Sequence, residues 1–435
     1  MKKILFLLML IPFITLAQHH ISGTFTPKEQ FSKVFLYQVT PNYPSYISYA
    51  SIKSDGTTSI PLESNLETGM YRLVFGAPQD EYYFDFIYNG NEDITFEYTA
   101  TEGVTFLTSE ENVLLQNYNA NADEAKHLLS ATFEPSVSKE TFSNVFKAID
   151  GIQNEYETKS EGMLANHFIK TGRLPIPQKQ ISLEEYLALE KANFFKHINF
   201  NDNALQHSNY LVNASKIYVF RFADKEQPQQ YINNIEDVIK EIGDNPVVQK
   251  SILEALWYDF SDNENMKVAN YISDNYLEKL ATVAGDKKLL SEIKIYKNTG
   301  VGAKAPNFNI GNSKSLYDLK DANNYLVIFW SSTCSHCLKE LPEVKKFLSN
   351  LENKNLQIVA FGLEENENPW KDTIKLYPDF IHVYGAGKWN NATSNAYNVT
   401  ETPTYYVLDT DKNIIAKPDS LEELEAALQG LPTTK

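Results

Sequence analysis

Cysteine is almost absent from this sequence, since only Cys334 and Cys337 occur among 435 residues. Such a chain has no framework of disulfides, unlike the small secreted domains that depend on one. A disulfide between two residues this close would close a very small loop, which adds little entropic stabilisation to a fold. The scarcity of cysteine therefore favours a reactive pair, with a structural disulfide as the alternative.

Basic residues are also fewer than acidic residues in this sequence. The chain has 39 Lys and Arg residues against 56 Asp and Glu residues, and its formal net charge is −17. This acidity argues against nucleic acid and anionic membrane surfaces as partners. The sequence contains no flavin or nicotinamide fingerprint either, so we predict no cofactor.

Metal-binding motifs are missing as well. A structural zinc site needs four ligands, and the sequence has neither a second C-x-x-C nor an H-x-x-x-H motif. Cys334, His336 and Cys337 together with an outside ligand such as His382 are the alternative that stays open. We predict no metal site.

Long hydrophobic runs are absent after the first residues. Met1-Lys2-Lys3 is a short positive segment, residues 4–16 are apolar apart from Pro12 and Thr15, and Ala17 completes a possible cleavage site. The run is too short to span a membrane comfortably, and no nearby cysteine marks a lipoprotein. We therefore expect residues 1–17 to be a signal peptide and the protein to be exported to the periplasm or cell envelope of a bacterium.

Three further segments differ in pattern, so we predict a multidomain protein divided at 18–110, 111–297 and 298–435. Residues 18–110 hold short alternating runs rich in Tyr, Phe, Val and Thr, which are typical of a small antiparallel β-sandwich. In residues 111–297 apolar residues recur at helical spacing, and Ser182-x-x-Glu185 matches a capping box. We expect an all-α domain there, with its aromatic residues in the core.

The last segment alternates between strand and helix patterns, which predicts an α/β domain with a mixed sheet covered by helices. The expected strands are 325–330, 357–363, 381–384, 404–409 and 414–417. The expected helices are 337–350, 370–377, 393–398 and 420–429.

Both cysteines follow the first strand of this segment. The C-x-x-C motif comes directly after the apolar run Tyr325–Trp330 and continues into a helical pattern. This order places the sulfur of Cys334 at a helix N-terminus, where backbone N–H groups and the helix dipole favour a thiolate. Because the thiolate is the form that attacks disulfides, the motif indicates thiol–disulfide exchange.

Three motifs in this segment resemble one family. They are Val301-Gly-Ala-Lys-Ala-Pro-Asn-Phe308 with Ser315-Leu-Tyr-Asp-Leu319, Cys334-x-x-Cys337-x-x-Glu340-x-Pro342, and Tyr397-Asn-Val-Thr-Glu-Thr-Pro403-Thr-Tyr-Tyr-Val-Leu-Asp409. On these residues, positions 301–435 resemble the TlpA/ResA-like thiol–disulfide oxidoreductases of the thioredoxin superfamily. The resemblance implies a thioredoxin fold preceded by an extra hairpin. In the β-rich region, from Ile21 to about Thr108, the motifs Ile21-Ser-Gly23, Ser54-Asp-Gly56 and Gly69-Met-Tyr-Arg72 resemble the β-rich domain of unknown function that often precedes such modules.

The resemblance also implies catalytic roles. Cys334 would be the nucleophile, and Cys337 would resolve the mixed disulfide with substrate. Glu340 lies three residues after Cys337 on a nearby helix face, where it can accept the thiol proton. Ile328 replaces the buried aspartate that thioredoxin uses for this purpose, which makes Glu340 the better candidate base. An exposed helix glutamate is the alternative.

His336 lies between the two cysteines. An imidazole near Cys334 would stabilise the thiolate and make the pair a stronger oxidant. A solvated turn residue is the alternative reading of His336.

Substrate binding is assigned to three residues. Thr402-Pro403 matches the cis-proline loop of the family, in which the backbone of Thr402 would pair with an extended substrate segment. Trp330 matches a family tryptophan. Most relatives carry another tryptophan just before the first cysteine, where this chain has Thr333, and Trp389 has no assigned place.

These residues predict an exported enzyme that acts on protein disulfides and thiols in the reductive direction, with a membrane thiol carrier as its electron source. One alternative is a disulfide oxidase or isomerase, suggested by His336 and by Thr402 before the proline. Another is a client-binding scaffold, in which the first two domains hold a client and the redox module is secondary.

Overall fold

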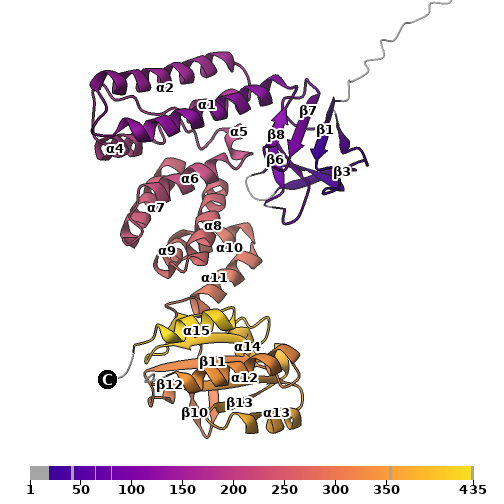
Figure 1. Cartoon of the computed structure of the whole chain (residues 1–435), viewed down its shortest axis with the longest axis vertical. Helices are drawn as coiled ribbons and strands as arrows, with labels where there is room; N and C mark the ends of the chain where they lie inside the picture. The colour runs from indigo at the N-terminus through magenta and orange to yellow at the C-terminus, as the bar shows by residue number, and fades with distance from the viewer. Residues whose placement is uncertain (1–18, 41–43, 64, 80, 352–354, 433–435) are drawn as a thin grey trace, which may run out of the picture. The chain divides into compact units, whose positions relative to one another are not determined.

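The computed structural model describes residues 19–40, 44–63, 65–79, 81–351 and 355–432. The predicted signal peptide, residues 1–17, lies outside the described residues. The chain divides into two compact units, Met1–Ile252 and Leu253–Lys435 (Figure 1). In the described part of the chain, no helix is long and apolar enough to cross a membrane. The predicted domain boundaries stay a prediction.

The first unit begins with a β-rich region. Its strands are β1 (His19–Thr26), β2 (Lys33–Gln38), β3 (Ser45–Ser51), β4 (Thr57–Leu62), β5 (Gly69–Val74), β6 (Tyr83–Tyr88), β7 (Ile94–Thr99) and β8 (Gly103–Phe106). They form two four-stranded sheets in the orders β4-β1-β7-β8 and β3-β2-β5-β6. Apolar side chains from both sheets, such as Ile21 and Tyr71, belong to one buried cluster. The predicted β-rich region is confirmed, and its arrangement as a sandwich stays a prediction.

The prediction of an entirely antiparallel arrangement is wrong at one strand pair. β1 and β7 are parallel, with Ile21 opposite Ile94 and Thr26 opposite Thr99. Between β4 and β7 the chain passes through β5 and β6 of the other sheet, and it then returns beside β1. Alternating hydrophobicity predicts that strands exist, but it does not predict which strands pair or in which direction.

Helices follow the β-rich region. They are α1 (Glu110–Thr132), α2 (Lys139–Lys159), α3 (Ala165–Thr171), α4 (Leu183–Asn193), α5 (Asn203–Gln206), α6 (Tyr210–Arg221), α7 (Pro228–Ile242) and α8 (Pro246–Asp262). The predicted capping box begins α4, where the Ser182 hydroxyl accepts from the Glu185 N–H at 3.2 Å and the Glu185 carboxylate accepts from the Ser182 N–H at 2.8 Å. Along α7, Ile235 and Val238 are fully buried. The predicted helical region is confirmed.

The second unit contains the end of α8 and further helices before its sheet. These are α9 (Met266–Ile272), the π-helical turn η1 (Ser273–Leu277), α10 (Glu278–Ala284) and α11 (Lys287–Thr299). β9 (Asn309–Gly311) and β10 (Lys314–Ser315) then pair antiparallel. This pair is the hairpin that the family resemblance implied.

A five-stranded mixed sheet forms the centre of the second unit, in the order β13-β12-β11-β14-β15. Its strands are β11 (Asn324–Trp330), β12 (Leu356–Glu364), β13 (Ile381–Ala386), β14 (Thr404–Leu408) and β15 (Ile414–Ala416). The helical segments are η2 (Leu316–Asp318), α12 (Ser335–Asn350), α13 (Glu367–Thr373), η3 (Ile374–Leu376), η4 (Lys388–Asn390), α14 (Ala392–Ala396) and α15 (Leu421–Gln429). The predicted α/β arrangement is confirmed.

The central strand β11 explains why this sheet is covered on both faces. All seven of its residues are buried, and successive side chains enter opposite cores because strand side chains alternate. Val327 and Phe329 belong to one buried cluster, while Ile328 and Trp330 belong to the other. The second cluster also contains side chains of α12 and α15, which lie near each other in Figure 1.

Candidate active site

The C-x-x-C motif lies where β11 ends and α12 begins. Cys334 is the N-cap of α12, and its sulfur accepts a hydrogen bond from the backbone N–H of Cys337 at 3.3 Å. The Cys334 side chain is partly exposed, whereas Cys337 has no exposed surface. The predicted position of the first sulfur and the predicted burial of the second are both confirmed.

The surroundings of Cys334 favour its thiolate. Burial raises the pKa of the Cys334 thiol, but hydrogen bonds outweigh it and hold the pKa below its usual value. These bonds come from the side chains of Cys337 and Thr402 and from the backbone N–H groups of Cys337 and His336. The Cys334 sulfur also lies 3.4 Å from the carbonyl oxygen of Thr402. This contact places the loop beside the partly exposed sulfur. The Thr402–Pro403 peptide bond is cis, as predicted.

The surroundings of Cys337 have the opposite effect. Burial and the hydrogen bond with Cys334 raise the pKa of the Cys337 thiol to about 12. One sulfur is therefore suited to attack from the surface, while the other stays protonated in the core.

This asymmetry predicts a difference in alkylation of the reduced protein. A lowered pKa means that Cys334 ionises at a lower pH than an ordinary thiol, whereas Cys337 stays protonated until about pH 12. We expect iodoacetamide to modify Cys334 alone from pH 6 to pH 9, as measured by peptide mass spectrometry. Parallel modification of both residues over this range would contradict the described environment.

Glu340 connects two side chains at the active-site helix. Its side chain is 12 % exposed and lies 2.9 Å from the Nε2 atom of His336. The hydroxyl of Tyr405 donates to the Glu340 carboxylate at 2.6 Å. The imidazole of His336 thus contacts Glu340, and the contact of His336 with Cys334 runs through its backbone N–H.

Tyr405 is a site residue that the sequence reasoning missed. It lies on β14 directly opposite Ile328 and belongs to the same buried cluster as Cys337. Burial, the hydrogen bond to Glu340 and the nearby Cys337 all raise the pKa of Tyr405. The only signal in the sequence was its place two residues after Pro403, in a strand whose partner was unknown.

Glu364 is a second missed residue. It ends β12, is 1 % exposed, and accepts hydrogen bonds from the backbone N–H and, at 2.9 Å, the hydroxyl of Ser332. Ser332 lies in the loop that connects β11 to Cys334. A buried carboxylate therefore holds the loop that positions the first sulfur. Its only signal was its place as the first acidic residue after an apolar strand pattern.

Trp330 does not lie where the substrate-binding prediction requires. Its side chain is fully buried in the cluster that contains Cys337. As the last residue of β11, it follows the alternation that also points Ile328 into this core. The prediction that Trp330 contacts substrate is therefore wrong.

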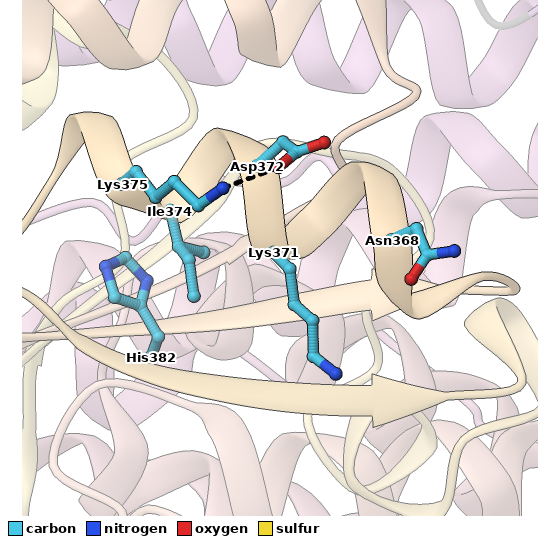
Figure 2. Close-up of a pocket in the computed structure, with 6 residues that line it drawn as sticks. All are labelled: Asn368, Lys371, Asp372, Ile374, Lys375 and His382. Carbon is cyan, nitrogen blue, oxygen red and sulfur yellow. Dashed lines mark hydrogen bonds and ion pairs between the residues drawn. The ribbon is translucent and has the colours of Figure 1, made fainter.

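His382, the outside ligand of the metal alternative, has a different environment. It lines a pocket of about 760 Å³ together with residues from α13 and η3, including Lys371 and Lys375 (Figure 2). Its Nε2 atom lies 2.7 Å from the carbonyl oxygen of Tyr377. Among the described residues, no group of three or more His, Cys, Asp and Glu side chains is arranged to hold a metal ion.

An exposed cysteine at a helix start, a buried second cysteine and a cis-proline loop on a mixed sheet define a dithiol site of the thioredoxin type. A family model described as thioredoxin-like matches residues 323–414. Thioredoxin-like protein YneN of Bacillus subtilis is 30 % identical over 126 residues, which cover 27 % of this chain and 72 % of that protein. The chain belongs to the thioredoxin-like family.

The chain is also similar to a second curated protein and to a solved structure. Thiol-disulfide oxidoreductase ResA of Bacillus cereus is 29 % identical over 136 residues, covering 30 % of this chain and 77 % of that protein. A solved thioredoxin-like protein from Bacteroides caccae is 19 % identical, with a TM-score of 0.40, and the match covers 59 % of this chain and 97 % of that one. The match to the ResA protein supports a redox function in thiol–disulfide chemistry.

Proposed function

We propose that this protein is a thiol–disulfide oxidoreductase that reduces protein disulfides through Cys334 and Cys337. The observation that carries the proposal is the contrast between the two sulfurs, since one is partly exposed with a lowered pKa and the other is buried with a raised pKa. A nucleophile must meet its substrate as a thiolate, whereas a resolving thiol must wait until the mixed disulfide has formed.

The reaction proceeds in two exchanges. The Cys334 thiolate attacks one sulfur of the substrate disulfide, so that a Cys334–substrate bond forms and the other substrate sulfur leaves as a thiolate. Cys337 then gives up its proton and attacks the Cys334 sulfur, which releases the second substrate thiolate. The substrate gains two electrons, its two thiolates take up the proton of Cys337 and one proton from solvent, and the cysteine pair becomes a disulfide. A membrane thiol carrier returns two electrons to it.

Glu340 is proposed to take up the proton of Cys337, with Tyr405 holding its carboxylate in place. We expect Glu340→Gln to slow resolution about tenfold, a small effect for a base because water can also accept the proton. Rapid-quench measurement of the mixed disulfide follows this step. The matched control is Glu343→Gln on the same helix, whose carboxylate is 59 % exposed, and an equal effect in both variants would remove Glu340 from the mechanism.

Two assays test the proposal and its direction. Reduction of insulin is measured with dithiothreitol as electron donor, and disulfide formation is measured with reduced ribonuclease. Faster insulin reduction supports a reductase, and faster disulfide formation supports the alternative of an oxidase or isomerase. The lowered pKa of Cys334 supports thiol–disulfide exchange in either direction, because a stabilised thiolate also makes the pair more oxidising. No acceleration in either assay would exclude the enzyme.

The scaffold alternative is supported by a cavity in the first unit. It measures about 660 Å³ and is lined mainly by side chains of α1, α4 and α6, including Leu129, Tyr186 and Ala214. Its largely apolar lining suits the apolar part of a client. An unchanged biological phenotype in a Cys334→Ser strain would favour this alternative over the enzyme.

Export to the bacterial envelope is part of the proposal. It is supported by the positive, apolar and small-residue segments of residues 1–17. Cell fractionation and the mass of the mature protein test it. A cytoplasmic protein that retains Met1–Ala17 would contradict it.

A further inference from the structure

An exposed tryptophan lies beside the reactive sulfur. Trp389 is 48 % exposed and shares a small pocket of about 110 Å³ with Thr333, Cys334 and Thr402. It lies on η4, which follows β13. In the described part of the second unit, Trp389 belongs to neither buried cluster. The stability of the core therefore does not account for its position.

The turn that carries Trp389 is held in place by its own backbone. The Gly387 N–H donates to the carbonyl of Glu364 at 3.0 Å, and the Asn391 N–H donates to the carbonyl of Lys388, also at 3.0 Å. Gly387 has a φ of 86°, a left-handed conformation that favours glycine. This anchoring places the indole next to Cys334 before any substrate arrives, which lowers the entropic cost of binding.

We propose that Trp389, with Thr333 and Leu363, forms a subsite for one apolar side chain of the polypeptide that carries the disulfide. The inference rests on the proposed function and adds a substrate preference to it. A pocket of this volume accommodates a single side chain of about leucine size. Because Cys334 lines the same pocket, the bound side chain belongs to a residue close to the cysteine under attack.

The neighbouring groups explain how a peptide fits. Thr402 lines the pocket and offers its backbone beside the sulfur, so an extended substrate can pair there while one of its side chains reaches Trp389. Tryptophan gives a large apolar surface with few rotatable bonds, which is why it often dominates binding energy. Thr333 is small and leaves the indole accessible.

The test compares two substrates and three proteins. The substrates are hydroxyethyl disulfide, which has no flanking residues, and a peptide disulfide with leucine beside each cysteine. The proteins are the wild type, Trp389→Ala and the matched control Leu376→Ala, which removes a side chain that is 62 % exposed outside this pocket. We expect Trp389→Ala to lower kcat/KM for the peptide about tenfold and to change the rate with hydroxyethyl disulfide less than twofold.

The outcomes separate the inference from the proposed function. Equal loss on both substrates, or no loss on the peptide, would overturn the subsite. A second measurement detects binding without any reaction. The same peptide with serine in place of each cysteine should quench the tryptophan fluorescence of the wild type, and Trp389→Phe should remove that quenching. If the wild type reduces neither substrate but binds this peptide through Trp389, the proposed function fails and the subsite stands. Absence of that binding overturns the subsite.

Discussion

Replacing Cys334 with serine is expected to lower the rate of insulin reduction by 10³-fold or more, on the order of the loss seen when other enzymes lose a nucleophile. The reason lies in the position of this sulfur. It is the partly exposed one, it caps α12, and its pKa is lowered by the hydrogen bonds around it. A serine hydroxyl in the same place stays protonated and cannot form a disulfide. Insulin turbidity measures the rate.

Cys337→Ser is the informative partner of this variant. It keeps the attacking sulfur and removes the one that resolves the mixed disulfide, so covalent adducts should accumulate instead of turning over. These adducts should appear on non-reducing gels of cell extracts and disappear on addition of dithiothreitol. Cys337 has no exposed surface, so it does not itself compete for substrate. A complete lack of adducts, or an active Cys334→Ser protein, would contradict the mechanism.

Replacing Trp330 with alanine is expected to destabilise the second unit by roughly 3–5 kcal/mol. The indole is fully buried in the cluster that contains Cys337 and Leu341, so its removal leaves a cavity beneath the active-site helix. The cleanest probe is the buried Cys337 thiol, which reacts with Ellman's reagent only when this core opens. In a Cys334→Ser background, its labelling should become about 10²- to 4 × 10³-fold faster, since each 1.4 kcal/mol corresponds to a factor of ten.

The control for this prediction is Trp330→Phe. The ring nitrogen of Trp330 has no hydrogen-bond partner in the described structure, so phenylalanine keeps most of the packing and loses no hydrogen bond. We expect its labelling to rise less than that of Trp330→Ala, because phenylalanine leaves a smaller cavity than alanine. Equal effects of alanine and phenylalanine would mean that packing is not what Trp330 contributes.

The parts of the site predicted from sequence are those that depend on near neighbours in the chain. An apolar run followed by C-x-x-C and a helical pattern is enough to place Cys334 at a helix start and Cys337 in the core. The assignment of Trp330 to substrate binding came from the family resemblance instead, and it is wrong because both faces of β11 are covered. A strand buried on one face would have left alternate residues exposed.

The missed residues all come from distant parts of the chain. Tyr405 reaches Glu340 across 65 positions, and Glu364 reaches Ser332 across 32. Each contact depends on which strands are neighbours and on their register, since a shift of one residue turns every side chain to the other face. Trp389 lies next to Cys334 for the same reason.

The amino-acid sequence by itself determined the local chemistry of the cysteine pair: its spacing and its place at a strand–helix junction follow from the order of neighbouring residues. Only the tertiary structure decided what surrounds that chemistry. Strand order and the covering of each face place Tyr405 against Glu340 and Glu364 against the loop before Cys334. They also bury Trp330 and leave Trp389 exposed. These are long-range packing outcomes, in which the burial of many side chains together outweighs any local preference.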